Sequence, residues 1–486
     1  MVGIRTAQYS SDSVSVAAQE IPLLSIDYAQ GETDLNFVFF YAAPRGRRRL
    51  PISCVKGSLL RAAQQFPVLL GHIVRGSDGN GDDGDGDNSE DGWKIVIDPG
   101  EINWPLVTES RAKGCTVAAL RRSGFDWKQW PTETQAPDLR THASKPLLGV
   151  HIVRYACGGV SLHTKVRHQC MDGNGVWRFY HTWSSICFAE LRRYAVPPLA
   201  QSGPTVASRL VLSSKLATPL SESDAAAIKY MDGVAQFLEE AAGIQRYSRA
   251  AEADGFRVHR FSLSQASIER LKLRHGKLAA CSSAHMGFVN QHGISYVSTN
   301  DLVCALFWRA IARAHQRLYP EDPHACMMLA CDIRNRIGVQ SAYGGNASFP
   351  LIMHMAKAQL AQQTITDTAT HIRRHVGLLC AGFVKRVLQF MASAESMEKL
   401  ISMFHPSKAF FSASIISKFP MFNMTNFGFG RPVHIDIPAY LTPGFSIWMP
   451  TRSSAQPVFV NLALTTGVFA LVRDDPEFRQ FVDIAH

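Results

Sequence analysis

The residues best suited to chemistry are a histidine and an aspartate four positions apart, His168 and Asp172, with Gly173 directly after them. An imidazole titrates near neutral pH, so it can accept a proton from a substrate and return it later. A nearby carboxylate can hold such a base in place. The pair therefore predicts general acid–base chemistry, although a purely structural histidine can have the same spacing.

The residues before His168 predict the strand that positions it. From 159 to 168, Val160, Leu162, Thr164 and Val166 alternate with Ser161, His163, Lys165 and Arg167. A period of two is typical of a β-strand, and it places His168 on the same face as the valines and the leucine. We therefore expect His168 at the end of a strand, pointing toward packed protein.

The residues after His168 predict a turn and then a helix. Gly173 and Gly175 can form the turn, and Asp172 or Asn174 can cap the helix. Apolar residues then recur at helical spacing, at Val176, Phe179, Tyr180, Trp183 and Cys187. The histidine thus lies at a strand-to-helix corner, where anchored neighbours can hold its side chain toward a cleft.

Composition predicts a large protein of mixed composition with more than one core. The chain has 486 residues, 46% hydrophobic and 19% charged, which is enough for two domains with separate cores. Its net charge is +10. No segment combines a basic face with interleaved aromatics, so we expect no nucleic-acid partner, whereas a phosphorylated small ligand fits the charge.

Cysteine spacing and hydropathy predict whether the protein binds a metal, which compartment it occupies and whether it spans a membrane. The ten cysteines form no CxxC pair and no zinc-like Cys/His spacing, which predicts no metal and a reducing compartment. No apolar run approaches the roughly eighteen residues of a membrane span, and no signal-like segment opens the chain. We expect a cytoplasmic protein without a membrane span. In that compartment the sequons at Asn346 and Asn423 are not expected to be glycosylated.

Strand-like and helix-like segments alternate along the chain, which predicts a mixed α/β (α+β) fold. We expect an N-terminal domain over 1–200, a helical crossover over 201–255 and a C-terminal domain over 256–486, part of which pairs with the first domain. Predicted elements include a strand at 35–41, helices at 52–66, 221–244 and 302–315, strands at 258–261 and 327–333, and a long helical region at 356–403.

Several other features are interpreted as structural. The basic cluster at 45–49 predicts a solvated loop, and the acidic run at 77–92 lacks the glycine and glutamate of a calcium loop. His151, His163 and His181 are expected to point in different directions. An SxxK sequence at 396–399 lies inside a helical pattern and GxSxG is absent, so a serine nucleophile is not expected.

Segments along most of the chain resemble, in order, the plant and fungal BAHD acyltransferases, whose hallmark is HxxxDG. Besides His168, Asp172 and Gly173, the similar segments are 21–27, 66–71, 146–159, 332–336 and 343–346. The run Asn426-Phe427-Gly428-Phe429-Gly430 is similar to the family's DFGWG motif. Asn426 replaces its aspartate, which leaves at best a neutral hydrogen bond, and Phe429 replaces its tryptophan.

The resemblance implies two chloramphenicol-acetyltransferase-like domains around a central solvent channel. It implies acyl-CoA as co-substrate, no permanently bound cofactor, and a small metabolite or glycolipid whose hydroxyl, or amine, accepts the acyl group. His168 would be the general base. Asp172 would turn away from the reacting atoms and pair with Arg334 or, second, Arg336. The segment Asn426–Gly430 would be mainly structural, beside the cofactor channel, and we expect a monomer.

Two alternatives stay open. A condensation-type enzyme would take its acyl group from a carrier protein, and its signature has a second histidine directly before the first. Arg167 occupies that position, which favours free acyl-CoA. A catalytically silent binding or regulatory relative is supported only by the altered Asn426 and Phe429, and the retained HxxxDG argues against it.

Overall fold

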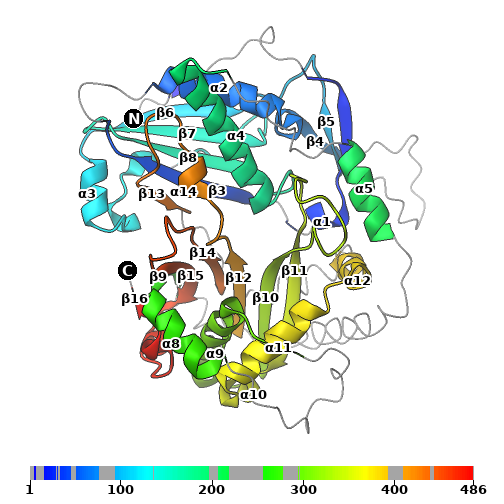
Figure 1. Ribbon diagram of the computed structural model, residues 1–486, viewed down its shortest axis with the longest axis vertical. Helices are drawn as coiled ribbons and strands as arrows, with labels where there is room; N and C mark the ends of the chain where they lie inside the picture. Colours follow the sequence, from blue (N-terminus) through cyan, green and yellow to red (C-terminus); the bar gives the residue numbers. More distant parts are fainter. Residues whose placement is uncertain are drawn as a thin grey trace. The chain divides into compact units, whose positions relative to one another are not determined.

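The computed structural model describes residues 5–6, 16–28, 30, 33–44, 51–75, 93–134, 136–195, 206–217, 255–276, 294, 296–391, 409–437 and 443–484. The chain forms two compact units (Figure 1). The first unit comprises Met1–Lys215, Gly338–Ala347 and Phe419–Pro438, and the second comprises Leu216–Ile337, Ser348–Lys418 and Ala439–His486. Segments from the second half of the sequence therefore belong to the first unit.

The first unit contains, in its described part, a six-stranded and a three-stranded sheet. The larger sheet has the order β1 (Arg5–Thr6), β6 (Leu106–Ala112), β7 (Leu148–Tyr155), β8 (Val160–Arg167), β3 (Asp34–Tyr41), β13 (His434–Asp436). The smaller has the order β2 (Gln19–Pro22), β5 (Trp93–Ile97), β4 (His72–Arg75). In the larger sheet β6 and β7 are parallel and the other neighbours are antiparallel.

Strand β8 is one of the two central strands of the larger sheet. It pairs with β3 from Val160 to Arg167 and with β7 on its other side. Leu162 and Val166 are fully buried. Because a slip of one residue would turn these side chains to the opposite face, burial specifies the register of β8 and with it the position of the residue after the strand.

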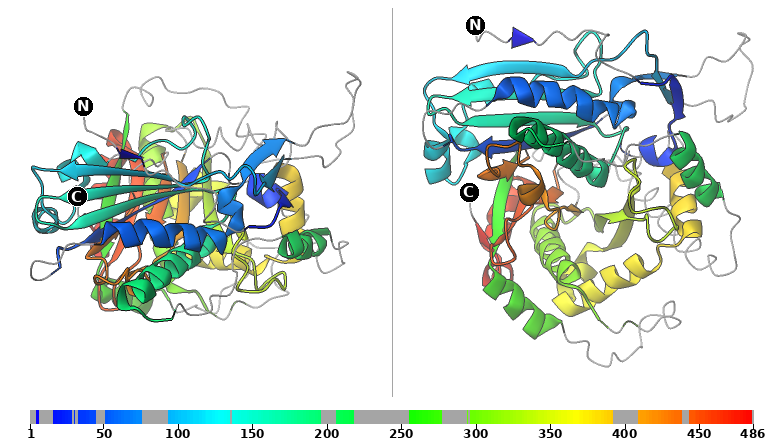
Figure 2. Two further views of the ribbon diagram at one scale, coloured as in Figure 1. Left: turned by 90° about the horizontal axis from the view of Figure 1, so that it is seen from above. Right: turned by 45° about the horizontal axis from the view of Figure 1, so that its top comes forward.

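The described part of the first unit also contains helices. They are α1 (Ser25–Tyr28), α2 (Ile52–Gln64), α3 (Val117–Arg122), α4 (Gly173–Arg192), α5 (Val206–Ala217) and α14 (Met421–Met424), with short 3₁₀ turns at Pro67–Leu70, Trp127–Gln129 and Thr132–Thr134. α2 and α4 pack against each other on one face of the sheet (Figure 2). The indole of Trp183 on α4 donates to the Val55 carbonyl on α2 at 2.9 Å. On the other face α3 closes a core around Val38, Phe40 and Val153.

The second unit is built around a sheet with seven described strands. Their order is β11 (Ser348–Ala356), β10 (His324–Asp332), β12 (Ala409–Ile415), β14 (Phe445–Trp448), β15 (Val458–Thr465), β9 (Phe256–Leu263), β16 (Asp483–Ile484). The helices are α8 (Gln265–His275), α9 (Thr299–Leu318), α10 (Lys357–Gln362), α11 (Ile365–Gly377), α12 (Ala381–Met391) and α15 (Thr466–Arg473), followed by a 3₁₀ turn at Phe478–Gln480. The long helix α9 packs against α8, α10, α11 and α15.

Most of the predicted elements that fall in described residues are confirmed, including β3, β8, β9, β10, α2, α4 and α9. The region predicted as helical at 356–403 is helical over most of 357–391, and residues 392–403 lie outside the described residues. It is divided into α10, α11 and α12, because Thr364 and Asp367 form a capping box that starts a new helix at Ile365. The predicted features at 45–49, 77–92, 221–244 and 396–399 lie outside the described residues.

Candidate active site

His168 lies directly after β8 and before α4, so the predicted strand-to-helix corner is confirmed. Its backbone N–H donates to the Thr33 carbonyl at 2.9 Å, and the Arg167 N–H donates to the Leu147 carbonyl at 3.0 Å. The chain is therefore held on both sides of the corner. The histidine itself is half-buried.

Asp172 shapes the start of α4. Its side chain is 1% exposed, and its Oδ1 accepts from the N–H groups of Asn174 at 3.0 Å and Gly175 at 3.1 Å. Its Oδ2 accepts from the Ala347 N–H at 2.9 Å. Of the two residues predicted to cap the helix, Asp172 is the N-cap. The same carboxylate thus ties the helix to a loop that comes 175 residues later in the chain.

The side chain of Asn346 holds the carbonyl groups of the corner. Its Nδ2 donates to the carbonyl oxygens of His168 at 2.8 Å and Gln169 at 3.2 Å, and to Asp27 Oδ1 at 2.8 Å. Asn346 is 0% exposed. Full burial agrees with the expectation that this sequon carries no glycan, and it gives the asparagine a structural reason to be present.

Asp27 completes this buried network from the first helix. It is 0% exposed, its Oδ2 accepts from the Leu24 N–H at 2.7 Å, and its Oδ1 accepts from Asn346. Sequence reasoning assigned no role to Asp27 or Asn346, although both lie in segments that resemble the BAHD pattern. Only the resemblance to the family could have pointed to these two residues. They are 319 positions apart, and local periodicity gives no information on contacts over such a separation.

A glycine on α4 allows the loop to approach the helix. A Cβ on Gly175 would overlap the Gly344 carbonyl oxygen and would lie 2.8 Å from the Met171 Cβ. Gly175 therefore admits the loop that carries Asn346, whereas Gly173, the glycine of the HxxxDG pattern, is the first residue of α4. Gly175, the second glycine of the predicted turn, is therefore needed because the backbone of Gly344 lies too close for a side chain.

The surroundings of His168 favour its neutral form. Burial lowers the pKa of the imidazole, and the residue's own backbone carbonyl, Asp172 and Asn346 oppose that shift. Within the described residues, Nδ1 is buried without a hydrogen-bond partner. A neutral imidazole has one unprotonated nitrogen, so the ring can accept a proton at physiological pH.

Comparison with known proteins identifies the family. A family model described as Transferase family matches residues 132–479, which is more than half of the chain. The chain belongs to the BAHD acyltransferases. The predicted family is therefore confirmed.

Two curated relatives and one solved structure show the extent of the similarity. O-acyltransferase pigD of Monascus ruber is 24% identical over 39% of this chain, a match that spans only 42% of that protein. Trichothecene 3-O-acetyltransferase of Fusarium sporotrichioides is 23% identical over 76% of this chain and 74% of its own length. The crystal structure of the latter, with coenzyme A and T-2, aligns with a TM-score of 0.67 at 17% identity, covering 97% of this chain and all of that one. The predicted mixed α/β BAHD fold is thus confirmed.

The second BAHD motif forms a tight loop in the first unit. Asn426 Oδ1 accepts from the N–H groups of Gly428 at 3.0 Å and Gly430 at 3.1 Å. The amide oxygen thus makes neutral hydrogen bonds where the family has a charged carboxylate. Both glycines have positive φ, 92° and 112°, a region that favours glycine.

The aromatic residues of this motif pack against Tyr41 and α4. The Phe427 ring meets Trp183 edge-on at 4.7 Å, and Phe429 meets Tyr41 edge-on at 5.0 Å. A Cβ on Gly428 would contact Leu191, near the C-terminal end of α4. His168 precedes the other end of this helix: Trp183 lies about 15 Å and Leu191 about 27 Å from the start of α4. In this BAHD chain the motif therefore packs on the C-terminal half of α4, and the histidine precedes the N-terminal end.

The two predicted arginine partners of Asp172 belong to the second unit. Arg334 is 2% exposed, and its backbone N–H and Nη1 donate to Asp332 Oδ1 at 3.0 and 3.2 Å. Arg336 is exposed, and its Nη1 lies 3.5 Å from the Leu379 carbonyl oxygen. The pairing of Asp172 with either arginine stays a prediction, as do the roles of His168 and Gly173.

One detail of the remaining histidines is corrected. His151 and His163 were expected to point in different directions, yet they are direct neighbours on β7 and β8, with ring centroids 6.0 Å apart. Their partners are side-chain hydroxyls and one carbonyl: His151 bonds Thr108, Ser110 and the Glu133 carbonyl, and His163 bonds Ser161. Burial lowers the pKa of both rings. The antiparallel register, which the sequence does not show, brings them together.

No three His, Cys, Asp or Glu side chains in the described part of the chain gather into a group that could hold a metal ion. No helix in the same residues has both the length and the apolar character needed to cross a bilayer.

Proposed function

We propose that this BAHD chain transfers an acyl group from acyl-CoA to a hydroxyl group of a small metabolite, with His168 as the general base. The observation that carries the proposal is the state of the imidazole. It is half-buried, burial lowers its pKa, and the backbone around it is held by Thr33, Leu147 and Asn346. A base in this state is ready to accept a proton at physiological pH.

The proposed reaction needs one proton acceptor. The imidazole removes the proton of the acceptor hydroxyl while the hydroxyl oxygen attacks the carbonyl carbon of the thioester. The resulting tetrahedral intermediate collapses, the carbon–sulfur bond breaks, and coenzyme A leaves as a thiolate. The imidazolium returns its proton to the sulfur, so the residue is neutral again and the ester is released.

Asp172 and Asn346 act as positioning residues in this proposal. Asp172 uses both carboxylate oxygens to accept backbone N–H groups, and Asn346 fixes the two carbonyls on the histidine side of the turn. Neither interaction requires contact with substrate. Together they hold His168 in one orientation, which matters because a displacement of about 1 Å can cost on the order of 100-fold in rate.

The choice of donor and acceptor rests on two kinds of support. The similar Fusarium structure contains coenzyme A and T-2, and both curated relatives cited above are named as O-acyltransferases or O-acetyltransferases. Within this chain, Arg167 occupies the position of the second histidine of condensation enzymes, and its guanidinium lies 3.7 Å from the Asp34 carboxylate. These observations favour free acyl-CoA over a carrier-bound donor and a hydroxyl over an amine.

The test is a thiol-release assay with acetyl-CoA and longer acyl-CoAs against a panel of hydroxylated metabolites. Wild-type protein should release coenzyme A and form an ester detectable as a mass increase. His168→Ala should lose about 10²- to 10⁴-fold in kcat, whereas His142→Ala, at an exposed histidine, should match wild type. Wild-type turnover with unchanged turnover in His168→Ala would remove the histidine from the mechanism.

Two further outcomes separate the alternatives. Transfer from an acyl carrier protein but not from acyl-CoA would support the condensation-type enzyme. Absence of transfer from either donor across the panel, with binding of the metabolites retained, would support a silent relative.

A further inference from the structure

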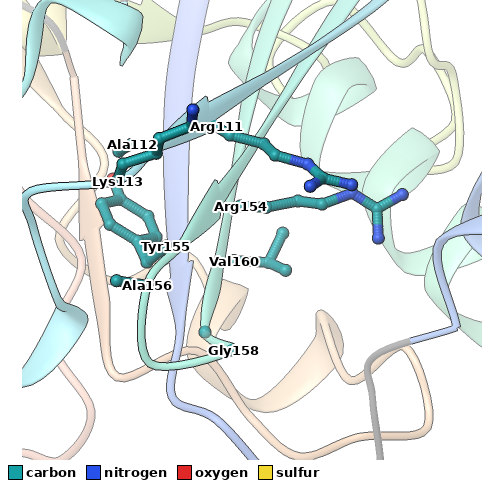
Figure 3. A pocket seen from close by; sticks show the side chains of 9 residues that line it. Arg111, Ala112, Lys113, Arg154, Tyr155, Ala156, Gly158 and Val160 are labelled. Atoms are coloured by element: carbon teal, nitrogen blue, oxygen red, sulfur yellow. The ribbon is translucent and has the colours of Figure 1, made fainter.

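A second concave site lies in the first unit, at the β7–β8 hairpin. It is a pocket of about 440 Å³, a size that suits a small molecule. It is lined by Arg111, Ala112, Lys113, Arg154, Tyr155, Ala156, Gly158, Gly159 and Val160 (Figure 3). None of these lining residues is acidic, and three are cationic.

The register of the sheet brings two of the cations together. Arg111 on β6 and Arg154 on β7 are direct neighbours in a parallel pair, and Val160 on β8 is the next residue in the same row. Figure 3 shows the two arginine side chains extending in the same direction from adjacent strands. Like charges placed directly opposite in a sheet are unfavourable unless an anion compensates them.

The carboxylate that pairs with Arg154 does not compensate all of this charge. Glu109 accepts from Arg154 Nε at 3.1 Å and Nη2 at 2.8 Å, and it also forms an ion pair with Lys56. The single carboxylate of Glu109 is therefore already shared between Arg154 and Lys56. Arg111 and Lys113 are exposed and add two more positive charges at the pocket.

The pocket is distant from His168 within the same unit. Val160 is the first residue of β8 and His168 follows its last, so the full length of an eight-residue strand separates them. At about 3.3 Å per residue this is roughly 26 Å. A molecule in the pocket is therefore too far away to be the group that reacts at the histidine.

We propose that this pocket binds the phosphate group of a small phosphorylated molecule. A phosphate carries two negative charges near neutral pH and several acceptor oxygens, and guanidinium groups bind such an oxyanion through paired N–H donors. Val160, the neighbour of Arg154 in the same row of the sheet, supplies apolar wall for the rest of the molecule. The phosphate belongs either to a free phosphorylated metabolite or to coenzyme A.

The experiment measures binding of inorganic pyrophosphate by calorimetry, at about 0.15 M salt to screen weak surface attraction. Arg111→Gln should raise the Kd about tenfold, the equivalent of one lost charge-assisted hydrogen bond. The matched control is Arg121→Gln, which removes the same charge from an exposed position on α3 outside the pocket. It should change the Kd less than about twofold, because a separate surface charge is screened. Circular dichroism checks that both variants fold.

Coenzyme A is titrated in parallel to identify the source of the phosphate. If Arg111→Gln weakens pyrophosphate and coenzyme A equally, the pocket holds the phosphate of coenzyme A. If it weakens pyrophosphate alone, the ligand is a separate phosphorylated molecule. Lack of pyrophosphate binding to wild type, or equal weakening by Arg111→Gln and Arg121→Gln, would overturn the site. These measurements do not need turnover, so their failure is distinguishable from failure of the proposed acyl transfer.

Discussion

Replacement of Asn346 tests whether the buried amide positions the histidine. In Asn346→Ala the Nδ2 donor disappears from three acceptors: Asp27 Oδ1 at 2.8 Å, the His168 carbonyl at 2.8 Å and the Gln169 carbonyl at 3.2 Å. An amide has two hydrogens, so it makes two good hydrogen bonds and shares the third contact. The bond to the carboxylate is the strongest of them, because its acceptor is a charged group.

The magnitude follows from these contacts. A hydrogen bond to a charged group contributes about 1.5–3 kcal/mol and one to a neutral carbonyl about 0.5–1.5 kcal/mol. The site is fully buried, so water does not readily replace the lost donor. We therefore expect Asn346→Ala to lower the free energy of unfolding by about 3–4 kcal/mol. The freed turn should also lower kcat by roughly 10- to 100-fold.

Asn346→Asp sharpens the test, since it keeps the shape but places a carboxylate beside Asp27. Two carboxylates at hydrogen-bond distance disfavour double ionisation, so the pair holds a proton and its pKa is raised in the folded state. A raised folded-state pKa gives stability below the unfolded pKa and loses it as pH rises through the folded pKa. Asn346→Asp should therefore be less stable relative to wild type at about pH 8 than at about pH 5.

The assay is urea unfolding followed by circular dichroism at both pH values, together with kcat by thiol release. Asn423→Ala, at the exposed asparagine of the other sequon, serves as the matched control and should resemble wild type. Full stability and full kcat in Asn346→Ala, or a pH-independent effect of Asn346→Asp, would refute the positioning role.

Four further predictions follow from the site and from α4. Burial lowers the pKa of His168, so the acid limb of the kcat/KM profile against pH should have its midpoint below the ordinary histidine pKa of about 6.5. A midpoint above that value would contradict the assignment of His168 as the general base. Gly175→Ala should destabilise the protein in thermal unfolding, because its Cβ overlaps a backbone carbonyl. Gly57→Ala on α2, with nothing within 4 Å of the new Cβ, should instead stabilise it by about 0.5–1 kcal/mol. Asp172→Ala should cost about 2–4 kcal/mol in urea unfolding, from the lost N-cap and the unpaired Ala347 N–H, and a loss below about 1 kcal/mol would argue against the cap. Asn426→Ala should lower stability by about 1–2 kcal/mol while kcat changes little, and a large loss of kcat would place the motif nearer the chemistry.

The sequence determined the local form of the site. Alternation from Val160 to Val166 specified a strand, and helical spacing after Gly173 specified α4, so the position of His168 at their junction was predictable. Such patterns are readable because strand and helix periods reflect which side chains are buried. The resemblance to BAHD acyltransferases then identified the family from residues that no periodicity would single out.

Only the tertiary structure decided which distant residues meet. The Asp27–Asn346 bond joins positions 319 residues apart, and residues 338–347 and 419–438 join the first unit although they come late in the chain. Register made neighbours of His151 and His163, and of Arg111 and Arg154. These contacts arise when separate strands and loops pack together, and local periodicity shows which face of a segment is buried but not which residue lies opposite.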